Sequence, residues 1–129
     1  MKVTVLGCGA SWGVPAIGPD WGRCDPTDPR NRRRRCSVLV ETQGRAILID
    51  TALDALAGIE LWVVDCLRRE AHPTHANLGK VLGWVERLRP KRTVLTHMDQ
   101  SLDYRELRAE LPAGVEPGHD GLAVELPDS

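Results

Sequence analysis

The side chains best suited to chemistry in this 129-residue sequence are histidines that lie close to predicted strand ends. His97 directly follows an apolar run, and His75 comes three residues after His72. A neutral imidazole is a good ligand for zinc or manganese and also transfers protons near neutral pH. A spacing of three suits one helical face, but Pro73 argues against a helix there. Metal binding or proton transfer is therefore indicated, with a structural hydrogen bond to the backbone as the plainer alternative.

Asp65 is the carboxylate best placed to work with these rings. It ends the apolar run 61–65, so it can accept a hydrogen bond from His75 or His97 and orient the ring. A purely structural role for Asp65 is an equal alternative. Asp50 and Asp54 follow another apolar run and are weaker candidates for metal ligands.

The basic run at residues 30–35 (RNRRRR) is the one concentration of charge. Arginine side chains match the geometry of phosphate groups, which favours an anion site. The plainer alternative is a solvated face paired with Asp20, Asp25 and Asp28. The glycines that precede this run do not form a dinucleotide-binding motif. Gly13 comes four residues after Gly9, where the motif has a spacing of three, and no helix can begin after it.

The elements that position these residues follow from apolar patterning. Continuous apolar runs predict strands covered on both faces, at 2–6, 36–41, 45–50, 61–65, 93–96 and 122–126. Residues 42–44 suit a hairpin turn. Apolar residues at helical spacing between 78 and 88 predict a helix that begins at an N-cap on Thr74 and ends before Pro90. A second helix is predicted over 104–110, which gives an α/β domain.

Composition places the chain among ordinary globular proteins of a single domain. Hydrophobic residues make up 42% and charged residues 27%, and the formal net charge is −1. A net charge this close to zero creates no electrostatic field that would favour binding to nucleic acid or to an anionic membrane. No apolar run approaches the length of a membrane span. Four cysteines without a C-x-x-C pair, in a chain that opens on a strand, favour reduced thiols in a soluble, cytoplasmic protein.

Several segments, taken in order, resemble one group of metal-dependent hydrolases. The N-terminal segments are 7–15 (GCGASWGVP), 20–25 (DWGRCD), 31–37 (NRRRRCS) and 48–51 (LIDT). The C-terminal segments are 61–68 (LWVVDCLR), 72–78 (HPTHANL), 90–98 (PKRTVLTHM) and 114–117 (GVEP). The set resembles the metallo-β-lactamase superfamily, in the group near phosphoribosyl 1,2-cyclic phosphate phosphodiesterase. The resemblance covers nearly the whole chain.

The resemblance implies a metallo-β-lactamase-like αββα sandwich that is shortened in the middle. Members of the family hold two transition-metal ions through a His-x-His-x-Asp-His motif, a further His and a bridging Asp. The sequence contains no His-x-His pair, and its four histidines are at 72, 75, 97 and 119. Residues 1–129 are therefore predicted to form one truncated domain with an internal deletion around 52–58.

The resemblance also assigns roles to the surviving residues. His97 matches the family's last metal ligand, with zinc or manganese as the implied cofactor. His75 matches a histidine that lies near the scissile phosphate and can protonate a leaving oxygen. Asp65 is expected to orient one of these rings, and the pair Asp65 and His75 forms the predicted catalytic set.

Two functions remain open on the sequence alone. The first is a phosphodiesterase-type hydrolase by ancestry, acting on a phosphoester small molecule or nucleotide with impaired or no activity. The second is a non-catalytic scaffold or minimised chain. The apolar strand residues Val64, Val94 and Leu95, with others like them, lose half of their expected cover, which predicts either a smaller closed core or a homodimer.

Overall fold

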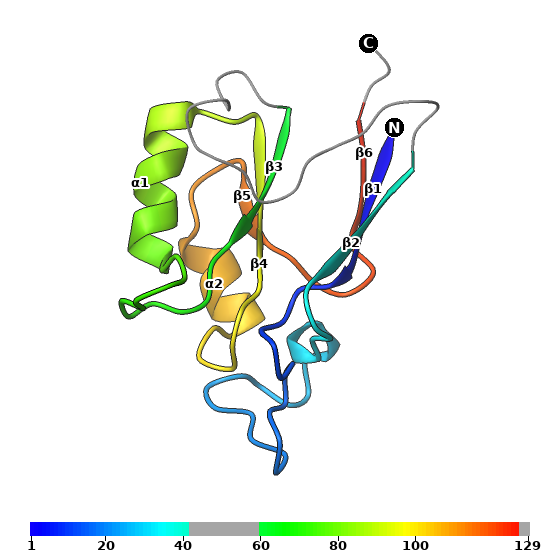
Figure 1. The fold of residues 1–129 in the computed structure, drawn as a ribbon, viewed down its shortest axis with the longest axis vertical. Coiled ribbons are helices and arrows are strands. Elements are labelled where there is room, and N and C mark those ends of the chain that lie inside the picture. The colour runs from blue at the N-terminus through cyan, green and yellow to red at the C-terminus, as the bar shows by residue number, and fades with distance from the viewer. Residues whose placement is uncertain (42–59, 127–129) are drawn as a thin grey trace.

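Two β-sheets face each other (Figure 1), and the buried core cluster joins strand residues of both sheets to residues of the two helices. The computed structural model describes residues 1–41 and 60–126. The first sheet has the order β2-β1-β6 and is antiparallel, with β1 at Lys2–Gly7, β2 at Ser37–Glu41 and β6 at Ala123–Glu125. The second has the order β3-β4-β5 and is parallel, with β3 at Leu61–Asp65, β4 at Arg92–Thr96 and β5 at Val115–Pro117.

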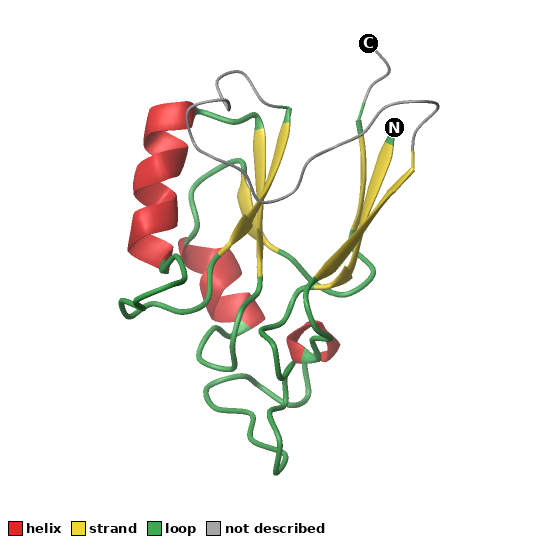
Figure 2. Ribbon diagram, viewed as in Figure 1, coloured by secondary structure: helices red, strands yellow, loops and turns green. Residues whose placement is uncertain are grey.

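Helices connect the strands of the second sheet, as parallel pairing requires. Helix α1 (Leu78–Leu88) joins β3 to β4, and helix α2 (Tyr104–Glu110) joins β4 to β5. Both lie on the side of this sheet that faces away from the first sheet (Figure 2). The crossover geometry brings the carboxyl ends of β3 and β4 to the same edge, where Asp65 pairs with Thr96.

Most predicted elements are confirmed. The runs predicted as strands at 2–6, 36–41, 61–65, 93–96 and 122–126 correspond to β1, β2, β3, β4 and β6. The helix predicted over 104–110 is α2. Strand β5 was not predicted, because three residues that end in a proline are too short to show a period. The strand predicted at 45–50, the turn at 42–44, and Asp50 and Asp54 lie outside the described residues.

The predicted start of the first helix is wrong. Its N-cap is Asn77, whose side-chain oxygen accepts a hydrogen bond from the N–H of Lys80 at 3.0 Å. Thr74 lies in the preceding loop, where its own N–H donates to Nδ1 of His72 at 3.2 Å. The helix ends on Arg89, in the left-handed region at φ 48°, directly before Pro90 as predicted.

The core covers much of the apolar surface that was expected to stay open. Val64 of β3 and Val94 and Leu95 of β4 are buried, and they pack in one cluster with Val5 of β1. These strand residues therefore offer no exposed face to a second copy, and the predicted homodimer remains a prediction. No helix within residues 1–41 and 60–126 is long and apolar enough to cross a membrane.

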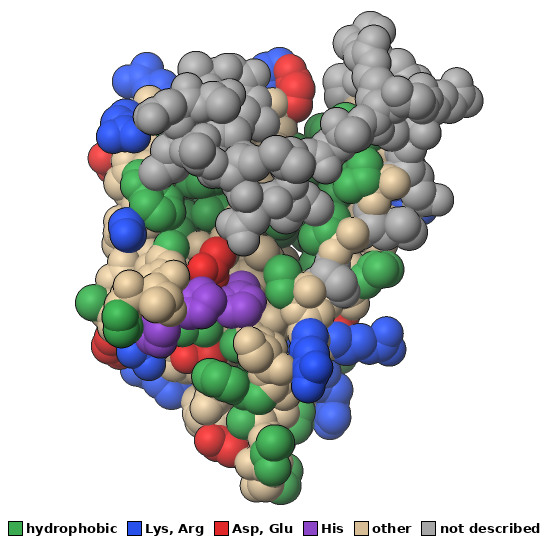
Figure 3. Space-filling view, in the orientation of Figure 1, with side chains coloured by type: hydrophobic (Ala, Val, Ile, Leu, Met, Phe, Trp, Pro, Cys, Tyr) green, Lys and Arg blue, Asp and Glu red, His purple; other side chains and the backbone are tan. Residues whose placement is uncertain are grey.

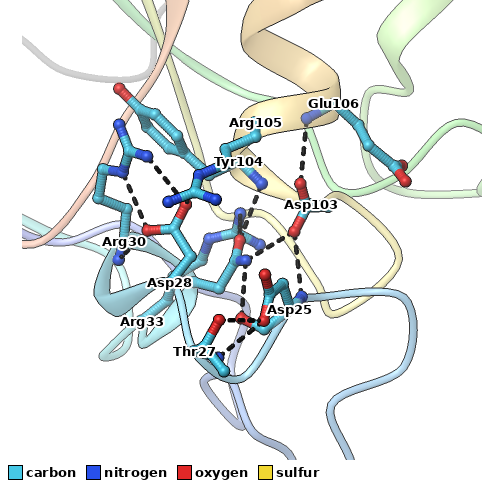
Figure 4. Close-up of polar contacts among 10 residues, drawn as sticks. Asp25, Thr27, Asp28, Arg30, Arg33, Asp103, Tyr104, Arg105 and Glu106 are labelled. Carbon is cyan, nitrogen blue, oxygen red and sulfur yellow. Dashed lines mark hydrogen bonds and ion pairs between the residues drawn. The ribbon is translucent and has the colours of Figure 1, made fainter.

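A buried polar network ties the long N-terminal loop to the loop before α2 (Figure 4). The Asp103 carboxylate accepts hydrogen bonds from the N–H of Asp25 at 3.0 Å and from the Asn31 amide at 2.7 Å. Arg33 is buried and donates to the carbonyl oxygens of Asp99 at 3.0 Å and Leu102 at 2.6 Å. The network thereby fixes the loop that follows His97.

Candidate active site

Three of the predicted site residues meet at the carboxyl edge of the second sheet. Asp65 is the last residue of β3, and His97 comes directly after β4. His75 is brought to them by the loop between β3 and α1. One ligand atom from each of these side chains lies within 4.8 Å of the others, and all three are partly buried. The structure therefore brings together three side chains that are separated by up to 32 positions in the sequence, and their role as a site stays a prediction.

His75 and Asp65 form a hydrogen-bonded pair. Nδ1 of His75 lies 3.0 Å from Oδ2 of Asp65. A carboxylate can only accept, so Nδ1 carries the hydrogen, and in the neutral ring Nε2 keeps a free lone pair. The other oxygen, Oδ1 of Asp65, is buried and has no hydrogen-bond partner among the described residues. A ring with its tautomer fixed in this way is suited to proton transfer or to metal binding.

His97 stacks on the same ring from the other side of the site. The two ring centroids lie 4.7 Å apart with 26° between the planes. The backbone of His97 is in the left-handed region at φ 59°, which costs a non-glycine residue about 1 kcal/mol. Met98 requires this bend, because its N–H donates to the carbonyl oxygen of Cys8 and its carbonyl accepts from Ala10. Pairing between the segments that follow β1 and β4 thus accompanies the turn of the chain at His97.

The other two histidines have separate roles. The His72 ring lies 5.1 Å from that of His75, but its Nδ1 accepts the hydrogen bond from Thr74. A neutral ring that accepts at Nδ1 carries its hydrogen on Nε2, so neither nitrogen is open to a metal. His119 stands edge-on to Tyr104 and its Nδ1 lies 3.1 Å from the carbonyl oxygen of Asp120. The contacts of His72 and His119 therefore fit structural roles.

The site reaches the surface and is not sealed. The side chains of His75 and Asp65 are 36% and 22% exposed. Figure 3 shows histidine side chains together on this face of the molecule, beside acidic ones. Both side chains are therefore partly open to solvent at this face.

Two buried cysteines, Cys66 and Cys8, do not contribute thiolates to the site. Burial raises the pKa of Cys66, which follows Asp65, to about 12. Burial raises the pKa of Cys8 to about 12 as well, and its thiol donates to the carbonyl oxygen of Gly118. A metal ligand must be the thiolate, so these buried thiols are poor candidates. All four cysteines are free.

The arginine run divides among several structural environments. Arg30 pairs with the buried carboxylate of Asp28 at 2.9 Å, as the solvated-face interpretation expected for that aspartate. Arg32 lies over the ring of Trp21, and Arg33 is buried in the loop network. Arg34 is largely exposed, with its guanidinium 3.9 Å from Asp120. The run is therefore not one solvated face, and phosphate binding at it stays a prediction.

Asp120 is a tethering residue that sequence reasoning missed. Its carboxylate accepts hydrogen bonds from the N–H of Cys8 at 3.1 Å and of Arg34 at 2.8 Å. These contacts join segments 112 and 86 positions apart. No local pattern could have predicted them, because the acceptor lies in an ordinary Gly-His-Asp-Gly turn.

One comparison with solved structures bears on this geometry. A crystal structure described as a new diphosphatase from the PhnP family matches with a TM-score of 0.87 and 21% sequence identity. The match covers 98% of this chain and 98% of that chain. The fold is that of the metallo-β-lactamases. No family model and no curated protein matches the sequence.

The comparison confirms the predicted fold class in its coarse form. The α/β, metallo-β-lactamase-like architecture is shown, whereas the shortening of the sandwich stays a prediction. The expected seam at 52–58 lies outside the described residues. The side chains of Asp65, His75 and His97 offer three ligand atoms to one ion. The same donor set does not fit the two-ion arrangement, which needs several ligands more.

Proposed function

We propose that this chain is a phosphoester hydrolase of the metallo-β-lactamase fold by descent, with slow turnover. The observation that carries the proposal is the His75–Asp65 pair beside His97, at the edge of the sheet where strand ends bring functional groups together. The fold and the ordered resemblance of eight segments support the same interpretation. A phosphoester small molecule or a nucleotide is the proposed substrate class.

The residues divide the work as the resemblance implies. His97 would hold a zinc or manganese ion, which supplies an activated water and stabilises negative charge on phosphoryl oxygens. Asp65 holds the tautomer of His75 through the 3.0 Å hydrogen bond. A protonated His75 would then donate to the leaving oxygen.

Slow turnover follows from the missing ligands. Water activation and charge stabilisation by two ions are each worth several kcal/mol of the barrier. Every loss of about 1.4 kcal/mol lowers the rate tenfold. A chain without His-x-His-x-Asp-His therefore falls many orders of magnitude below a complete two-metal enzyme.

The absence of the His-x-His-x-Asp-His motif from the sequence also favours a second function, one without catalysis. A single shortened domain over 1–129, with a deletion around 52–58, can serve as a non-catalytic scaffold, and a homodimer is the proposed assembly for it. The scaffold proposal requires no chemistry at His75 or His97.

Turnover of bis(p-nitrophenyl) phosphate with manganese or zinc separates the two functions. The hydrolase proposal expects a slow metal-dependent rate that is lost in His75→Ala and kept in His72→Ala, a neighbouring ring outside the site. A rate equal to that of buffer with metal alone would reject the hydrolase and leave the scaffold. Equal loss in both variants would point to damage to the loop.

A further inference from the structure

Three cationic side chains meet at the edge of the second sheet that lies opposite the candidate active site. Arg92 is the first residue of β4 and Lys91 precedes it, whereas Arg108 belongs to α2, which packs on β5. The strands of this sheet are parallel, so these residues mark its amino edge. Arg92 and Thr96 stand at the two ends of β4, and that strand spans roughly 13 Å of extended chain. The cationic group is therefore separate from the histidines at the carboxyl edge.

A cavity of about 350 Å³ opens between these side chains. Its lining includes the three cations and, in Glu116, a single carboxylate, together with Gly114 and Val115. The lining thus carries an excess of two positive charges. Pockets for small molecules begin at roughly 300 Å³, so the cavity has room for a small anion.

Glu116 positions the two arginines at the wall of this cavity. Its side chain is only 17% exposed and accepts a hydrogen bond from Nε of Arg92 at 2.5 Å. Nη1 of Arg108 lies 3.8 Å from the other carboxylate oxygen, which is an ion-pair distance and too long for a hydrogen bond. A guanidinium carries five N–H donors, so Glu116 engages one donor of Arg92 and none of Arg108. It holds two guanidinium groups in place and leaves donors of both for another acceptor.

Lys91 reaches the cavity from the surface, where it is held weakly. Its Nζ lies 2.5 Å from Oε1 of Glu60, and the two side chains are 71% and 48% exposed. An exposed ion pair contributes at most about 1 kcal/mol. An anion in the cavity can therefore draw Lys91 away from Glu60 at little cost.

We propose that this cavity binds a phosphate group. A phosphate group carries about two negative charges near neutral pH, which balances the excess charge of the lining. Its oxygens also accept the paired hydrogen bonds that a guanidinium donates. The site goes beyond the proposed function, because binding at the amino edge needs neither a metal nor the residues of the carboxyl edge. No local sequence pattern contains it, since its lining comes from the start of β4, from α2 and from β5.

Nuclear magnetic resonance of the ¹⁵N-labelled chain tests the proposal. Inorganic phosphate and AMP are titrated separately, with sodium chloride used to hold the ionic strength constant. We expect saturable shifts of the backbone amide signals of Lys91, Arg92 and Gly114 with both ligands. Tighter binding of AMP would identify a nucleotide as the source of the phosphate, and equal binding would identify the phosphate group alone. The absence of saturable shifts at these amides, or the same shifts with chloride alone, would overturn the site.

Four substitutions at exposed positions assign the binding to the cavity. Lys91→Gln and Arg108→Gln should each weaken phosphate binding about tenfold, because each removes a charge-assisted hydrogen bond. Glu60→Gln should strengthen it about threefold, since it releases Lys91 from its surface partner. The matched control is Arg23→Gln, which removes an arginine that also lies 3.8 Å from a carboxylate, that of Glu106, but does not line the cavity.

All four side chains are at least 48% exposed, so each variant should fold as the native chain does. Binding should be unchanged in Arg23→Gln. Equal weakening in Arg23→Gln and Arg108→Gln would show a general effect of charge and overturn the site. Unchanged affinity in both Lys91→Gln and Arg108→Gln would overturn it as well.

Discussion

Replacement of Asp103 should destabilise the chain more than any other single carboxylate change in the loop network. Its side chain is the N-cap of α2, where it accepts from the N–H of Glu106 at 3.0 Å. The same carboxylate accepts from the N–H of Asp25 and from the amide of Asn31. One buried side chain thus closes a helix and fastens the N-terminal loop to it (Figure 4).

The magnitude can be built from these contacts. Loss of an N-cap costs about 1 kcal/mol. Loss of the acceptor for Asp25 and Asn31 adds roughly 1–2 kcal/mol, since Asn31 keeps its second bond to the carbonyl oxygen of Asp25. Asp103→Ala should therefore lower the free energy of unfolding by about 2–3 kcal/mol. Asp103→Asn retains one carbonyl oxygen and should cost about 1 kcal/mol.

The pH dependence gives an independent check. Burial favours the neutral form of Asp103, but the hydrogen bonds outweigh it and lower its pKa below the ordinary 3.8. The unfolded chain then binds the proton more readily than the folded chain. The contribution of Asp103 to stability is therefore fully present above pH 3.8, the ordinary pKa, and is lost as the pH falls through the lower pKa of the folded state. Urea denaturation at pH 7 and at about pH 3 should show a smaller acid loss for Asp103→Asn than for the native chain.

Glu125→Gln is the matched control, because this exposed side chain on β6 lies outside the network. It should change the free energy of unfolding by less than about 0.5 kcal/mol. Native-like stability of Asp103→Ala at pH 7 would refute the reasoning, as would an identical acid loss in Asp103→Asn and the native chain.

Three further outcomes follow from local geometry. Asn77→Ala should lower the free energy of unfolding by about 1 kcal/mol in urea titration, while Thr74→Ala changes it little, and the reverse order would restore the sequence-based cap. His97→Gly should be about 1 kcal/mol more stable than His97→Ala, because only glycine adopts φ 59° without cost. In the native chain at pH 8, Ellman's reagent should label the exposed Cys36 and leave buried Cys66, whose pKa is about 12, unmodified until urea is added.

Much of the fold could be predicted from the sequence because its strands are continuous apolar runs. Burial on both faces leaves a strong signal, as in 61–65, which the structure has as β3 without a change of bounds. The ends of the apolar runs also indicated where the candidate site lies, since Asp65 ends one run and His97 follows another. The histidine of the connecting loop, His75, could be assigned only through the resemblance.

The remaining features depend on contacts that no local pattern contains. Thr74 and Asn77 are both good N-caps by type, but Asn77 caps the helix at Lys80, whereas Thr74 donates its N–H to His72 in the preceding loop. Arg33 sits in a run of basic residues but is buried, because carbonyl oxygens 66 and 69 positions away accept its hydrogens. Such partners are specified by the fold rather than by spacing.

The order of strands in the first sheet has a consequence for how the chain acquires its structure. Strand β1 is the central strand, and its neighbour β6 comes from residues 123–125, so Lys2 pairs with Glu125. The second sheet is assembled from a contiguous stretch between 61 and 117 and can form from shorter loops. During synthesis, β1 can therefore pair along both of its edges only after residues 123–125 have been made. Until then β1 presents an open edge on which another chain can add a strand.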